Sequence, residues 1–146
     1  MELSDALHER ITQLSFEGDE LADMGRCREA VAKYLQALEL VPEPKTDWEA
    51  ATWLLVAIGD ANFHSKHYEP ARAALRDAMH CPGAFGNPFI HLRLGQSLFE
   101  LGDIAHASDE LARAYMGAGK ELFANEDPKY VAHLKTVLSP PASGEW

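Results

Sequence analysis

The stretch LADMGRCREAVAKYLQALELVPEP, residues 21–44, holds the pattern that decides the fold. Gly25 predicts a break between two helices. Ala30, Tyr34 and Ala37 then lie about one turn apart, on one face of the second helix. Small side chains on that face let another backbone come close, and the prolines that follow end the helix. One helix pair would bury such a face poorly, so the stretch predicts a neighbour of its own kind.

Two further copies of the pattern follow in the chain. Residues 18–42, 59–83 and 95–119 can be aligned so that small residues coincide in three sets: Gly18, Gly59 and Gly95; Ala30, Ala71 and Ala107; Ala37, Ala78 and Ala114. Tyr34 then aligns with Leu75 and Leu111. The copies begin 41 and 36 residues apart. The chain therefore contains an internal repeat, and we expect the six alanines to be buried between helices.

The repeat resembles the tetratricopeptide repeat (TPR), a helix–turn–helix unit of about 34 residues. In the third copy the matching residues are Leu94, Gly95, Leu98, Ala107 and Leu111. The place of the consensus tryptophan is taken by Leu14, Leu55 and His91, which departs from the pattern. The resemblance implies an all-α fold, an α-α superhelix of three TPR-like helix pairs plus a C-terminal capping helix. The pairs are expected at about residues 11–44, 52–85 and 88–121 and the capping helix at about 128–138, in a single domain over 1–138 with a flexible tail at 139–146.

Local signals place the helix ends. We expect helices over about residues 4–24 and 26–41, and a capping box of Thr46 and Glu49 opening a third helix that ends near residue 65. A fourth is expected over about 69–80. Asn87 opens the fifth helix, Gly102 closes it and Asp103 caps the sixth. The last helix would present Tyr130, Val131, Leu134 and Leu138 to the end of the stack.

Composition narrows the class of protein. The formal net charge is −10, and residues 1–50 hold 12 acidic and 5 basic residues, with no basic patch. This charge argues against binding to nucleic acid through its phosphates and favours a basic protein partner. The longest apolar run, WLLVAIG, is too short to span a bilayer, and no signal peptide is evident at the N-terminus. Cys27 and Cys81 are too few for a disulfide scaffold, so we expect a cytoplasmic protein without membrane contact.

No motif predicts catalysis or a cofactor. His64 and His67 are three residues apart, but no acidic residue or cysteine completes an evident metal-ligand set, so we interpret them as structural or solvated. The glycine-rich segments follow no strand and do not resemble phosphate-binding loops. The sequence therefore predicts a protein that is not an enzyme and holds no metal or cofactor.

A binding surface remains. The first helix of each TPR pair lines the concave side of the stack, which is the usual binding surface. The resemblance places Ser15 in that groove, and it predicts partner contacts at Asp19, Asp23, Trp53, Asp60, His64, Phe89, Arg93 and Gln96. Val56, Phe63, Leu92 and Phe99 either face the groove or pack between repeats. Acids beside early-helix aromatics suit a basic, partly apolar protein surface.

The partner class is narrowed by what the groove lacks. TPR domains that clamp chaperone carboxylates use basic groove residues. The corresponding region here offers Ser15, Asp19 and Asp60, and its acids would repel a carboxylate. Residues 110–138 resemble the C-terminal end of TPR proteins found with secreted polymorphic toxins. The sequence thus favours a bacterial immunity protein that neutralises a basic toxin domain by occlusion. The alternatives are a type III-like secretion chaperone holding an apolar translocator segment, or a general TPR scaffold.

Overall fold

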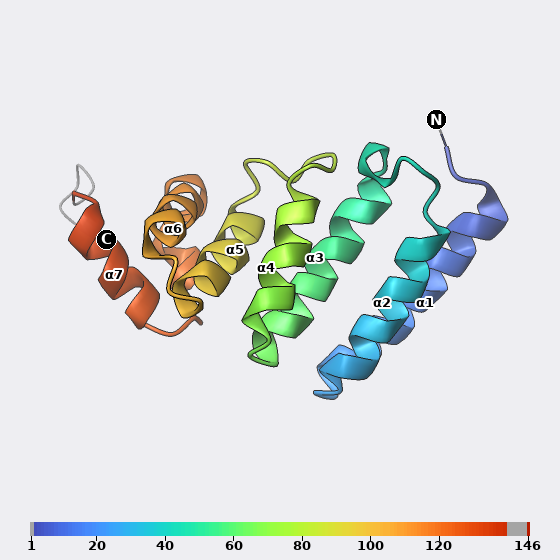
Figure 1. Cartoon of the computed structure of the whole chain (residues 1–146), viewed down its shortest axis with the longest axis horizontal. Helices are drawn as coiled ribbons and strands as arrows, with labels where there is room; N and C mark the ends of the chain where they lie inside the picture. Colours follow the sequence, from blue (N-terminus) through green and yellow to red (C-terminus); the bar gives the residue numbers. More distant parts are fainter. Residues whose placement is uncertain (1, 140–145) are drawn as a thin grey trace. The chain divides into compact units, whose positions relative to one another are not determined.

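The computed structural model describes residues 2–139 and 146, and these residues form helices and turns without a strand. The seven α-helices of this part of the chain are α1 (Asp5–Asp23), α2 (Cys27–Leu40), α3 (Glu49–His64), α4 (Tyr68–Ala78), α5 (Pro88–Glu100), α6 (Ile104–Ala118) and α7 (Lys129–Val137). Two short 3₁₀ helices, η1 (Lys45–Asp47) and η2 (Lys120–Phe123), lie in connections. Figure 1 labels these helices and colours them along the sequence. The all-α class with three helix pairs and a last helix is confirmed.

The chain divides into two compact units, Met1–Ala84 and Phe85–Trp146. In the first unit α1 packs on α2, α3 packs on α4, and α2 also packs on α3 (Figure 1). In the second unit α5 packs on α6, and α7 packs on α6. The single domain over residues 1–138 stays a prediction. The expected flexible tail lies mainly outside the described residues, since residues 140–145 are not among them.

The aligned glycines explain why each helix pair closes tightly. A Cβ atom placed on Gly18 would lie 2.5 Å from the ring of Tyr34, and the same atom on Gly59 would lie 2.5 Å from Cγ of Leu75. On Gly95 it would lie 2.8 Å from Cγ of Leu111. Only a residue without a side chain leaves room for the large residue of the partner helix. All six aligned alanines are fully buried, at 0% exposure, so that prediction is confirmed.

The helix ends match the sequence signals at most sites. The side chains of Ser4, Asn87 and Asp103 each accept a backbone N–H at the start of a helix. The predicted capping box is wrong. Residues 45–47 form the 3₁₀ turn η1 instead, so Trp48 occupies the cap position of α3 and no side chain caps it. The fourth helix also ends earlier than expected, at Ala78, and a turn follows.

The last helix covers an apolar face of the second unit. Tyr130 and Leu134 are buried, and the Tyr130 hydroxyl donates to Oε1 of Glu100 at 2.7 Å. The ring of Phe99 meets the ring of Tyr130 edge-on, with centroids 5.5 Å apart. Helix α7 therefore acts as the expected cap, with two large buried side chains and polar contacts from Tyr130 and Lys129 to Glu100 of α5.

Candidate functional site

A hollow of about 270 Å³ opens between α1 and α3 in the first unit. We call it the α1–α3 hollow. Its floor is apolar, formed by Ile11, Leu54 and Ala57, and its rim carries side chains that can bond or stack. The lining residues with polar or aromatic side chains are His8, Thr12, Ser15, Asp19, Tyr34 and Trp53. Two of the predicted contact residues, Asp19 and Trp53, thus come together in one concave surface.

Trp53 is the largest exposed side chain at this rim. It is 46% exposed although it lies on α3, whose other faces are largely buried. Buried aromatic side chains are satisfied by packing, whereas an indole left half-exposed beside an apolar floor offers contact area to another molecule. Trp53 therefore presents the most exposed apolar surface of the predicted contact residues in the first unit, and its role in binding stays a prediction.

Asp19 is held in place by the side chain of Tyr34. The Tyr34 hydroxyl donates to Oδ1 of Asp19 at 2.6 Å, so the exposed carboxylate has a fixed position at the rim. Burial of the ring, followed by this hydrogen bond, raises the pKa of Tyr34 above its ordinary value. The hydroxyl therefore donates this hydrogen bond at neutral pH.

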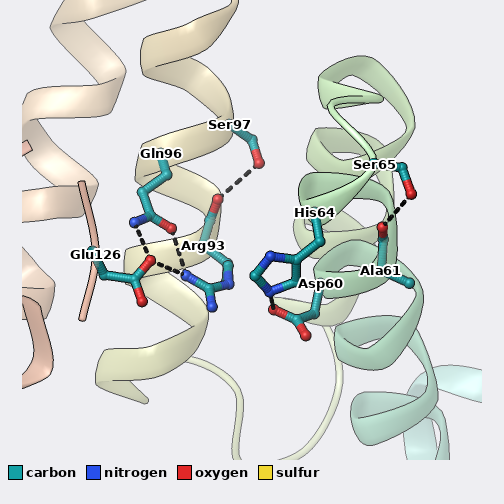
Figure 2. Close-up of polar contacts among 8 residues, drawn as sticks. All are labelled: Asp60, Ala61, His64, Ser65, Arg93, Gln96, Ser97 and Glu126. Atoms are coloured by element: carbon teal, nitrogen blue, oxygen red, sulfur yellow. Dashed lines mark hydrogen bonds and ion pairs between the residues drawn. The ribbon is translucent and has the colours of Figure 1, made fainter. Parts of the chain in front are cut away.

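Three other predicted contact residues do not line this hollow. Asp23 is exposed at the end of α1. On α3, Nε2 of His64 lies 3.3 Å from Oδ1 of Asp60, one helical turn away, as Figure 2 shows. These side chains form a polar edge on the same unit, and their role in binding stays a prediction.

Arg93 and Gln96 require a correction, because the structure does not place them on an open surface. They are 6% and 0% exposed, and both donate to Oε1 of Glu126, at 2.6 and 2.7 Å (Figure 2). The same guanidinium lies 5.0 Å from the ring centre of half-buried Phe89. Both side chains therefore point inward, and their hydrogen bonds to Glu126 attach the segment before α7 to α5.

The residues whose role was left open also divide. Val56 and Leu92 are buried and pack internally, while Phe63 and Phe99 are partly buried.

The sequence did not predict one buried polar pair. His91 is 2% exposed, its Nδ1 lies 2.5 Å from Oε2 of Glu110, and its Nε2 accepts the N–H of Gly86 at 2.9 Å. A histidine in the consensus tryptophan position was the available signal for this structural pair.

The described residues hold no group of three or more His, Cys, Asp or Glu side chains that could bind a metal ion. Burial raises the pKa of the Cys81 thiol, and its Sγ lies 3.6 Å from the Asp77 carbonyl oxygen. A thiol in that state is a poor nucleophile. Within the described part of the chain, no helix is both long and apolar enough to cross a bilayer.

Comparison with known proteins supports the fold. A scan against protein-family models and a search of curated protein sequences both found no match. Among solved structures, the chain is similar to the C-terminal TPR-containing domain of an FK506-binding protein from Plasmodium falciparum. The TM-score is 0.71 at 14% sequence identity, over 92% of this chain and 91% of that one. This similarity shows a TPR helical-repeat fold.

Proposed function

We propose that this chain is a non-catalytic protein-binding domain and that the α1–α3 hollow is its contact surface. The observation that carries the proposal is the half-exposed indole of Trp53 above an apolar floor, beside the fixed carboxylate of Asp19. Binding energy at protein interfaces concentrates in such aromatic anchors, with polar groups at the rim. The hollow accepts an apolar side chain and its rim accepts a hydrogen-bond donor or a cation.

Charge supports a basic partner. Residues 1–50, which include all of α1 and α2, hold 12 acidic and 5 basic residues. Opposite charge on the partner raises the rate of association and excludes acidic competitors. The finer proposal is a bacterial immunity protein that covers the active site or substrate channel of a basic toxin domain. The resemblance of residues 110–138 to TPR proteins found with secreted toxins supports it.

A secretion chaperone is the second candidate, and the apolar floor of the hollow favours it. Ile11, Leu54 and Ala57 would hold an apolar segment of a translocator in extended form. Binding of that kind depends on buried apolar area and responds weakly to salt, whereas occlusion of a basic toxin responds strongly. Salt dependence therefore separates the two candidates.

The test starts from the neighbouring genes: any secreted protein that they encode is co-expressed with this chain and its binding is measured. Association and dissociation rates are measured at two salt concentrations. Trp53→Ala should speed dissociation, because a buried anchor contributes about 2 kcal/mol or more, on the order of 30-fold in affinity. Asn at positions 19, 23 and 60 together should slow association and flatten its salt dependence. Phe16→Ala is the matched control, since Phe16 is an exposed aromatic of α1 outside the hollow.

Each outcome decides between the proposals. Protection of cells from the toxin, lost with Trp53→Ala and kept with Phe16→Ala, supports immunity through the α1–α3 hollow. Stabilisation of an apolar segment without protection supports the chaperone. If substitutions on α2 and α4 weaken binding while Trp53→Ala does not, the binding surface is a different one.

A further inference from the structure

A second hollow adjoins the first at the N-terminal end of α3. It measures about 670 Å³ and lies wholly within the first unit. We call it the end hollow. It shares Trp53, His8 and Ala50 with the α1–α3 hollow, so Trp53 stands at the junction of the two. A partner side chain that contacts Trp53 in one hollow therefore lies next to the other hollow.

Acidic residues dominate the charged lining of the end hollow. Its lining includes the carboxylates of Glu2, Asp47 and Glu49 and contains no lysine or arginine. All three acids are exposed, and none forms a hydrogen bond or ion pair through its carboxylate within the described residues. Many other acids of this unit have a basic partner nearby, as Glu29 has Arg26 and Glu17 has Lys33. Among the residues that the structure describes, the three acids around the hollow therefore have no basic partner of this kind.

Two indoles line the same hollow. Trp53 is half-exposed, and Trp48, which is partly buried against the hydrophobic core, is also a lining residue. Nε1 of Trp48 is covered and has no hydrogen-bond acceptor in the described part of the chain, so packing alone positions this ring. Indole faces attract cations, and tryptophan does so more strongly than the other aromatic residues. Carboxylates and indole faces in one cavity select for positive charge.

We propose that the end hollow binds a single arginine side chain of the partner protein. The proposal rests on the proposed function, because the arginine belongs to the segment that contacts Trp53. Arginine fits better than lysine, since its planar guanidinium can lie on an indole while its N–H groups reach two carboxylates. The two adjoining hollows then bind two neighbouring side chains of the partner: the α1–α3 hollow binds an apolar side chain and the end hollow binds an arginine.

A small probe tests the site without the partner. The ¹⁵N-labelled full chain is titrated with N-acetyl-arginine amide, and with N-acetyl-citrulline amide, which has the same shape without the charge. The indole N–H signals are assigned with Trp→Phe variants. The signals of Trp48 and Trp53 should shift saturably with the arginine probe and not with citrulline, while that of Trp146 stays in place. Combining Asp47→Asn with Glu49→Gln should weaken binding of the probe about three- to tenfold.

Matched controls keep the result interpretable. Glu20→Gln with Glu39→Gln removes the same charge from exposed acids that line neither hollow, and should leave the affinity for the probe unchanged. Thermal unfolding of both double variants shows whether each is folded. Equal shifts with citrulline, no shift at Trp48 and Trp53, or equal losses in the two double variants would overturn the site.

Failure of this site differs from failure of the proposed function. If the arginine probe does not bind while Trp53→Ala still weakens the natural partner, the arginine site is wrong and the binding surface stands. If the probe binds with the expected selectivity but Trp53→Ala does not weaken binding of the natural partner, the arginine site stands and the proposed function fails.

Discussion

At the scale of single residues, Tyr34 shows how a repeat position acquired a second role. Its ring fills the space that Gly18 leaves open, and its hydroxyl fixes Asp19 at the rim of the α1–α3 hollow. The aromatic place of the repeat pattern accounts for the first role. The second depends on the acid that directly follows the glycine. One side chain therefore joins the packing of the first helix pair to the shape of its surface.

Tyr34 should also make the free energy of unfolding fall at alkaline pH. Burial and the bond to Asp19 raise its pKa in the folded state above the ordinary value of about 10. Its contribution is thus fully present below about pH 10 and is lost as pH rises through the higher folded value, because the unfolded chain releases the proton first. The free energy of unfolding of the native protein should therefore fall towards that of Tyr34→Phe as the pH rises above about 10. Parallel decline of the two proteins would assign the effect to other groups.

The two cysteines should differ in reactivity. Burial raises the pKa of Cys81, so little thiolate is present near neutral pH, while Cys27 is only half-buried at the start of α2. In the folded protein, iodoacetamide at pH 8 should alkylate Cys27 faster than Cys81, as measured by mass spectrometry of peptides. In urea the two rates should converge. Equal rates in the folded protein would contradict the buried position of Cys81.

At the scale of helices, the glycine contacts decide the sign of a substitution. Gly→Ala inside a helix ordinarily stabilises by up to about 1 kcal/mol through backbone propensity. At Gly59 the added Cβ would meet Leu75, and overpacking costs about 1–3 kcal/mol. We therefore expect Gly59→Ala to lower the free energy of unfolding, measured by urea denaturation. In a Leu75→Ala background the same change should cost less, and additive losses would show that the contact is not the cause.

A second element-scale prediction concerns the segment before α7. Glu126→Ala removes the acceptor of both Arg93 and Gln96, which are buried. Hydrogen bonds to charged groups contribute about 1.5–3 kcal/mol, so a loss of that size is expected in urea denaturation. Glu121→Ala, an exposed acid of η2, serves as the control. Equal effects of the two substitutions would show that the buried network adds nothing.

The repeat pattern predicted the helices because it consists of small residues at fixed spacing, and close packing leaves few alternatives to glycine and alanine there. The position of Arg93 followed no such rule. Its acceptor, Glu126, lies 33 residues further on, and nothing in the local sequence indicates that it turns inward. The capping box predicted at Thr46 was also wrong, because the local residues alone did not decide the structure there. The residues favoured a cap, yet the chain formed a 3₁₀ turn before α3 could begin.

At the scale of the whole molecule, net charge should oppose folding. The chain carries 23 acidic and 13 basic residues, and folding brings these like charges closer together. Salt screens such repulsion over about 10 Å at 0.1 M. Raising NaCl from 10 to 150 mM should therefore increase the melting temperature, and KCl should act equally. A decrease would show that the ion pairs outweigh the net repulsion.

The surface was predictable only in part. Asp19 and Trp53 could be placed together because the resemblance assigns both to first helices of neighbouring pairs. The hollow between them depends on how far α1 and α3 stand apart, which follows from many core side chains together. The end hollow depends further on Trp48 and on η1, a turn that the sequence did not indicate.

The glycine contacts have a consequence for folding during synthesis on the ribosome. In every pair the glycine and its large partner stand the same short distance apart along the chain, 16 residues. Contacts this local close quickly, because little chain entropy is lost in forming the loop. A ribosome releases residues at roughly 5–20 per second, far more slowly than such a hairpin forms. Each helix pair can therefore assemble as it emerges, and both walls of the α1–α3 hollow stand before the final helix has been synthesised.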